Sequence, residues 1–145
     1  MTTVDTYKSI ITELFDTLTE DATLKTAMGG TVKACLHMAP TDEDMPYLVH
    51  VLSIRDTDFY PIQQGTYTVN IYSTTLADEA LAIRKRIVEL LDQQLLDTDD
   101  VKHIQVEKYS EGFVTEDSPG TWHYVIVFNL RFYRTSEVDS IVNRS

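Results

Sequence analysis

The apolar run WHYVIVFNLRFYR, residues 122–134, limits the possible folds of this chain more than any other feature. Its residues alternate with a period of two, the period at which the side chains of a β-strand point to opposite faces of a sheet. One face would carry Trp122, Tyr124, Ile126, Phe128, Leu130 and Phe132, and the other His123, Val125, Val127, Asn129, Arg131 and Tyr133. So long a strand, with one strongly apolar face, needs other strands beside it and a layer that covers that face.

Four shorter segments supply the other strands, because each is rich in β-branched, aromatic or alternating apolar residues. They are residues 31–38, 47–54, 66–73 and 101–110. Segment 47–54 is apolar on both faces, which predicts a central strand. The polar stretches 55–65 and 111–121 are predicted to be exposed connections between strands, and the first is longer than an ordinary hairpin loop.

Two amphipathic patterns predict the covering layer. Residues 4–19 and 76–95 both place apolar side chains at spacings of three and four. Thr2 with Asp5 resembles a capping box for the first helix, and Thr75 is the expected N-cap of the second. We therefore predict an α+β domain in the order α-β-β-β-α-β-β, with two main helices packed on one face of a mainly antiparallel sheet of about five strands.

The composition sets limits on partners and location. The 145 residues fit one domain, and 12 basic against 23 acidic residues give a formal net charge of -11. Tight binding to DNA phosphates needs clustered Lys and Arg, so this balance argues against a protein that holds nucleic acid. No apolar run approaches the roughly 18 residues of a membrane span, and the N-terminus lacks the features of a secretory signal. We expect a protein made in the cytoplasm, with no membrane partner.

The sequence contains no common catalytic or cofactor motif. A phosphate-binding glycine loop, a nucleophile elbow and a zinc-binding helix motif are all missing. His37, His50, His103 and His123 have no spacing that indicates a metal site, and the single cysteine, Cys35, excludes an internal disulfide. We predict no catalytic residues, no cofactor and no metal.

Taken in order, five features resemble the tail terminator or tail completion family of long-tailed bacteriophages and prophages. They are the N-terminal amphipathic helix, PYLVHV at 46–51, YTVNIYS at 67–73, ADEALAIRKRIVELL at 77–91, and the final strand WHYVIVFNLRFYR. The resemblance covers roughly residues 4–134. It implies a single tail-terminator-like domain over residues 1–135 and a flexible C-terminal tail over residues 136–145.

The resemblance also implies a structural role in the virion, at the tail or neck. Members of the family form hexameric rings at the head-proximal end of the tail tube, where they stop tube polymerisation and present a surface to head completion proteins. The implied partners are further copies of the chain, the tail tube protein and a head completion or stopper protein. DNA would pass through the lumen without specific binding, and we expect part of the acidity to line that lumen.

Exposed aromatic residues among acids are typical of contact loops, and two such groups are our candidate interface residues. The first is Asp56, Asp58, Phe59 and Tyr60, and the second is Glu111, Phe113, Glu116 and Asp117. Three other functions stay open at this point. The chain could be another head-tail connector ring, a small dimeric α+β enzyme, or a ligand-binding module.

Overall fold

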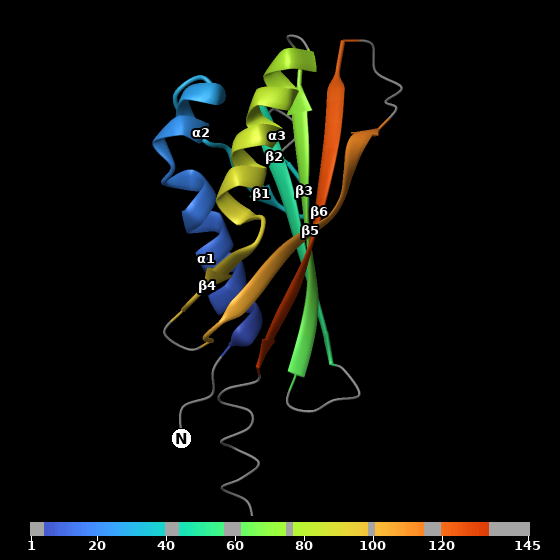
Figure 1. The fold of residues 1–145 in the computed structure, drawn as a ribbon. Coiled ribbons are helices and arrows are strands. Elements are labelled where there is room, and N and C mark those ends of the chain that lie inside the picture. The colour runs from blue at the N-terminus through green and yellow to red at the C-terminus, as the bar shows by residue number, and fades with distance from the viewer. Residues whose placement is uncertain are drawn as a thin grey trace, which may run out of the picture.

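A computed structural model describes residues 5–39, 44–56, 62–74, 77–98, 101–114 and 120–133. Over these residues the chain forms one twisted sheet with a helical layer on one side (Figure 1). The elements are α1 (Thr6–Thr19), α2 (Ala22–Ala27), β1 (Ala34–Leu36), β2 (Tyr47–Asp56), β3 (Ile62–Ser73), α3 (Ala77–Leu91), β4 (Gln94–Leu96), β5 (Ile104–Val114) and β6 (Trp122–Tyr133). The predicted α+β class is confirmed.

The sheet has the strand order β1-β2-β3-β6-β5-β4. Strands β3 and β6 form its centre, and they pair antiparallel along their whole length, from Ile62 opposite Tyr133 to Ser73 opposite Trp122. Strands β2 and β5 flank them, also antiparallel, while β1 pairs with β2 in parallel. The sheet is therefore mainly antiparallel, as predicted. Segment 47–54, predicted as a central strand, lies between β1 and β3, but β1 pairs with only three of its residues.

The core lies between the helices and one face of the sheet. The large aromatic side chains Tyr67, Phe128 and Phe132 are fully buried at its centre. Helix α1 contributes Ile10, Ile11, Leu14 and Leu18, and helix α3 contributes Ala80, Ile83, Ile87 and Leu91. On β6, the predicted apolar face is buried from Tyr124 to Phe132, so its alternation is confirmed. The helices cover one face of the sheet, as the amphipathic patterns predicted.

The helix starts differ in part from the predicted caps. Asp5 is itself the N-cap of α1, and its Oδ1 accepts a hydrogen bond of 3.0 Å from the backbone N–H of Lys8. Asp5 therefore does not act as the third helical residue of a capping box that begins at Thr2. Thr2 and Thr75 lie outside the described residues.

Two short elements, helix α2 and strand β4, were not predicted, so the sheet has six strands where about five were expected. Strand β4 begins within the predicted helix 76–95, because that helix ends at Leu91. Strand β1 is three residues long where 31–38 was predicted. These segments are too short to show a periodic pattern, and the contacts that stabilise them come from elsewhere in the chain.

Two segments predicted to be loops are partly strand. Strands β2 and β3 extend to Asp56 and from Ile62, so most of 55–65 is paired. Strand β5 extends to Val114, through the first part of 111–121. Strand pairing satisfies backbone groups whatever the polarity of the side chains, so polar residues can continue a hairpin that the central strands support. Within the described part of the chain, no helix has the length and apolar character to cross a membrane.

Candidate interface surfaces

The sheet face that points away from the helices is the first surface available to partners, and we call it the open face (Figure 1). It consists of Tyr47, Val49, Val51, Ser53 and Arg55 on β2; Gln64, Thr66, Thr68, Asn70 and Tyr72 on β3; His123, Val125, Val127, Asn129 and Arg131 on β6; and Gln105, Glu107, Ser110, Gly112 and Val114 on β5. Glu107 is the only carboxylate among them, and Arg55 and Arg131 are the only Arg or Lys residues. Most of the acidic residues that the structure describes therefore lie away from this face.

One end of the open face is ordered by a row of rings across three strands. Tyr47 stacks on Tyr72 with ring centroids 5.1 Å apart, and Tyr72 stacks on His123 at 4.2 Å. His123 Nε2 lies 2.8 Å from Asn70 Oδ1, and Asn70 Nδ2 donates a hydrogen bond of 3.2 Å to the carbonyl oxygen of Val49. The side chains of His123 and Asn70 are hydrogen-bonded within the sheet, so this row has a structural role.

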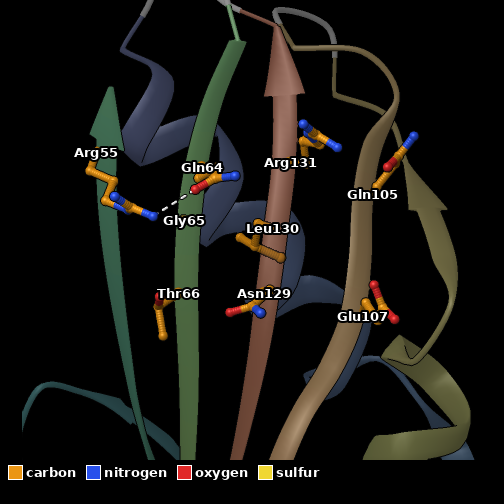
Figure 2. Close-up of a pocket in the computed structure, with 9 residues that line it drawn as sticks. All are labelled: Arg55, Gln64, Gly65, Thr66, Gln105, Glu107, Asn129, Leu130 and Arg131. Atoms are coloured by element: carbon orange, nitrogen blue, oxygen red, sulfur yellow. Dashed lines mark hydrogen bonds between the residues drawn. The ribbon is translucent and has the colours of Figure 1, made fainter. Parts of the chain in front are cut away.

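A polar groove of about 280 Å³ crosses the other end of the open face (Figure 2). Its lining comes from β2, β3, β6 and β5, with Arg55 and Gln64 on one side and Gln105 and Glu107 on the other. Arg55 Nη2 donates a hydrogen bond of 2.7 Å to Gln64 Oε1. Ligand sites are usually mostly apolar and enclosed, whereas this groove is polar and its side chains are largely exposed.

The structure places only part of the predicted interface residues. Asp58, Phe59, Tyr60, Glu116 and Asp117 lie outside the described residues, as do residues 136–145. Asp56 is the last residue of β2, and its side chain is not described. Glu111 and Phe113 lie on β5 and not in a loop, which corrects the prediction for that segment. Asp56 and Phe113 lie towards opposite ends of the sheet, because β2 ends where β5 begins.

Glu111 ties the sheet to a helix. Its carboxylate forms ion pairs with Arg84 of α3 at 2.5 Å and with Lys108 at 2.9 Å, and it accepts a hydrogen bond of 2.8 Å from the Tyr124 hydroxyl. Burial disfavours the charged carboxylate, but the hydrogen bonds from Lys108, Tyr124 and Arg84 outweigh it, so the pKa of Glu111 lies below its usual value. Its partners within the chain give this residue a structural role.

Phe113, in contrast, offers apolar surface to a partner. Its ring packs edge-on against Tyr124 at 4.8 Å and Trp122 at 5.8 Å, yet 46% of the residue is exposed. Its neighbours on β5, Tyr109 and Val114, are also exposed, at 72% and 43%. Tyr109, Val114 and Trp122 were missing from the predicted interface. The sequence places these three residues in predicted strands or loops. It does not show which strand lies beside β5, and their exposure depends on that.

The two outer long strands each have an edge that lacks a strand partner among the described residues. Strand β4 pairs with β5 only from Ile104 to Val106, and Asp92 then accepts a hydrogen bond of 2.8 Å from the Lys108 backbone N–H. Strand β1 pairs with β2 only from Leu48 to His50. We call residues 109–114 the β5 edge segment and residues 51–56 the β2 edge segment. Unpaired strand edges are templates for pairing with another chain.

The histidines of the described residues have separate, structural surroundings. No group of three or more His, Cys, Asp or Glu side chains in the described part of the chain could hold a metal ion. His50 and His123 lie on strands, whereas His37 and His103 follow and precede strands at positive φ angles of 68° and 56°. His50 is buried, with its Nδ1 2.8 Å from the hydroxyl of Tyr67 in the core. Burial and the nearby His37 lower the pKa of His50 to about 4.

The fold is similar to that of a chain in a gene transfer agent particle and to that of a bacteriophage protein. A chain in the virion of a native gene transfer agent particle is similar over 90% of this chain and 99% of that chain, with a TM-score of 0.72 and 12% sequence identity. The bacteriophage SPP1 gp17 protein is similar over 88% of this chain and 90% of that chain, with a TM-score of 0.55 and 20% identity.

These likenesses establish the fold, since both sequences are far from this one. At that level they confirm the resemblance to the phage tail terminator family that the sequence predicted. No protein-family model matches the sequence, and no curated protein is significantly similar to it.

Proposed function

We propose that this chain is a structural virion protein that forms a hexameric ring at the head-proximal end of a phage tail tube. There it terminates tube polymerisation and joins the tail to the head or neck. The observation that carries the proposal is the match to a virion chain over 99% of that chain and 90% of this one. A match of this extent means that the whole described fold, and not a fragment of it, is of a kind used in such particles.

The shape of the subunit supports a role between two partners. A ring with different neighbours above and below needs two different contact surfaces on each subunit. The end of β2 and the end of β5 lie at opposite ends of the sheet, and the described members of the two predicted interface groups lie on these strands, Asp56 on β2 and Glu111 and Phe113 on β5. In this proposal one end contacts the tail tube protein and the other contacts a head completion or stopper protein, while DNA passes through the lumen without specific binding.

Capping of purified tail tubes tests the proposal. Tubes are incubated with this protein, and fresh tube subunits are then added while tube length is followed by electron microscopy. We expect density at one end of each tube and no further growth at that end. Continued growth at both ends would contradict tube termination.

The alternative is a connector ring elsewhere in the neck. Such a ring would bind the head completion protein and leave tube growth unchanged. Pull-down with each purified neighbour therefore separates the two readings. The fold match alone does not, because it concerns the particle and not the position within it.

A further inference from the structure

We infer that neighbouring copies of this chain join their sheets edge to edge, with the β5 edge segment of one copy antiparallel to the β2 edge segment of the next. The inference rests on the proposed ring and names the segments through which its subunits meet. Because these are two different surfaces at opposite edges of the sheet, each copy would use one for each neighbour. This is a heterologous contact, the kind that generates rings.

The two edge segments have the same length, and in the described part of the chain both lack a strand partner on the outer side. Each spans six residues, 109–114 and 51–56, between a short covering strand and the end of its own strand. Among the described residues, neither segment has a strand on its outer side. Phe113, Val114 and Tyr109 leave exposed apolar surface along one of them. An uncovered hydrophobic edge of this kind promotes association with other chains. A specific partner strand would pair with its free backbone groups and cover its apolar side chains.

The side-chain alternation selects the register. When Ser110 is placed opposite Arg55 and Val114 opposite Val51, each residue from Ser110 to Val114 meets one from the same face of the sheet, and the bulge residue Tyr109 lies opposite Asp56. Ser53 then faces Gly112 on the open face, and Leu52 faces Phe113 on the helix side. A shift by one residue would place core positions opposite open-face positions, which sheets with one buried face exclude.

The same register predicts the tilt of the strands. Within one copy, Ile54 is level with Leu130 on β6, whereas its proposed partner Glu111 is level with Ile126. Each repeat of the four long strands is therefore displaced by four residues along β6, or one residue per strand. A barrel of eight strands with a shear of eight has the same ratio, and its strands tilt by about 36°. This tilt lies within the roughly 35–45° of closed barrels, so the repeats can close without climbing along the axis.

The paired sheets would form the inner wall of the ring. The helices form the thicker layer and need the larger circumference, so they lie outside and the open face lines the lumen. This wall would carry few charges, since Glu107, Arg55 and Arg131 are the only Asp, Glu, Lys or Arg residues of the open face.

Disulfide crosslinking tests the register in a Cys35→Ser background. Ser53→Cys and Gly112→Cys suit the purpose, because Ser53 is exposed and a Cβ at Gly112 has no neighbouring atom within 4 Å. The double variant should give covalent oligomers of up to six copies on oxidation. Each single variant alone should stay uncrosslinked, and a mixture of the two single variants should give only covalent dimers.

As a control, Ser53→Cys is combined with Glu107→Cys. Glu107 lies on the same strand and the same face as Gly112, but outside the β5 edge segment. This pair should give no covalent oligomers. Native mass spectrometry, with and without tail tubes, reports ring formation independently of crosslinking. Rings without crosslinks in the double variant would overturn the edge pairing and leave the proposed function intact. The absence of both rings and crosslinks, even on tube ends, would overturn both proposals.

Discussion

His50 gives the fold a pH dependence whose size follows from its surroundings. The residue is 2% exposed, beneath Phe15 and against the edge of Tyr67, and its pKa is about 4 in the folded chain. In the unfolded chain the pKa of a histidine is about 6.5. Between these values the unfolded state binds the proton and the native state does not. The free energy of unfolding is therefore highest above about pH 6.5 and falls as the pH is lowered towards 4.

The expected loss at pH 5 can be worked out from the two pKa values. At that pH the unfolded histidine is almost fully protonated and the folded one is about one-tenth protonated, which corresponds to about 2 kcal/mol. His50→Gln removes this contribution, because glutamine does not titrate but can still form a hydrogen bond with the Tyr67 hydroxyl. The variant should be less stable at neutral pH, since the ring packing is lost, but it should lose less stability on acidification.

Urea unfolding at pH 7.5 and pH 5.0, followed by circular dichroism, measures the difference. His103→Asn is the control, because His103 is exposed and asparagine tolerates its positive φ of 56°. The control should lose as much stability on acidification as the unmodified protein. If His50→Gln also loses as much, the buried neutral histidine does not account for the pH dependence, and the reasoning is wrong.

Three further predictions concern the cap of α2, a close backbone contact and the β5 edge segment. Asp21→Ala should lower the free energy of unfolding by about 1–2 kcal/mol in urea, and Asp21→Asn by less, because the amide oxygen still caps the helix. Gly65→Ala should cost about 1–3 kcal/mol, since a Cβ there would lie 3.1 Å from a carbonyl oxygen of β2, while Gly112→Ala should change stability by less than about 0.5 kcal/mol. Phe113→Ser should reduce ring formation in native mass spectrometry, while Leu81→Ser, at a similarly exposed position on α3, should not; equal effects would contradict a specific edge contact.

The long elements could be predicted because each has a periodic apolar pattern along its own sequence. One face is buried along most of the length of four elements, namely helices α1 and α3 and strands β3 and β6. Helix α2 could not be predicted in this way. It has six residues, and Asp21, at its start, is held by Arg86 of α3 through two hydrogen bonds of 2.7 and 2.8 Å. The contact spans 65 positions, so no local window contains it.

The exposure of the candidate interface residues could be predicted only in part, for a related reason. Phe113 was identified correctly as an exposed aromatic residue, but Glu111 was grouped with it although Arg84, Lys108 and Tyr124 hold its carboxylate. Whether a strand edge is covered depends on the order of the strands in the sheet. That order places β6 between β3 and β5, and sequence patterns do not contain this information.

The distribution of charge between the two faces changes how the proposed ring would handle DNA. The sequence led us to expect acidic residues around the lumen, because the chain carries a net charge of -11. If the open face lines the lumen, the wall contains one carboxylate, Glu107, and two cations, Arg55 and Arg131, per copy. Arg55 keeps its positive charge while it donates to the neutral Gln64, so the wall offers the phosphates two cations against one carboxylate per copy. Weak adhesion of DNA would then follow from a wall of amides and hydroxyls that offers little charge, and not from repulsion by acids.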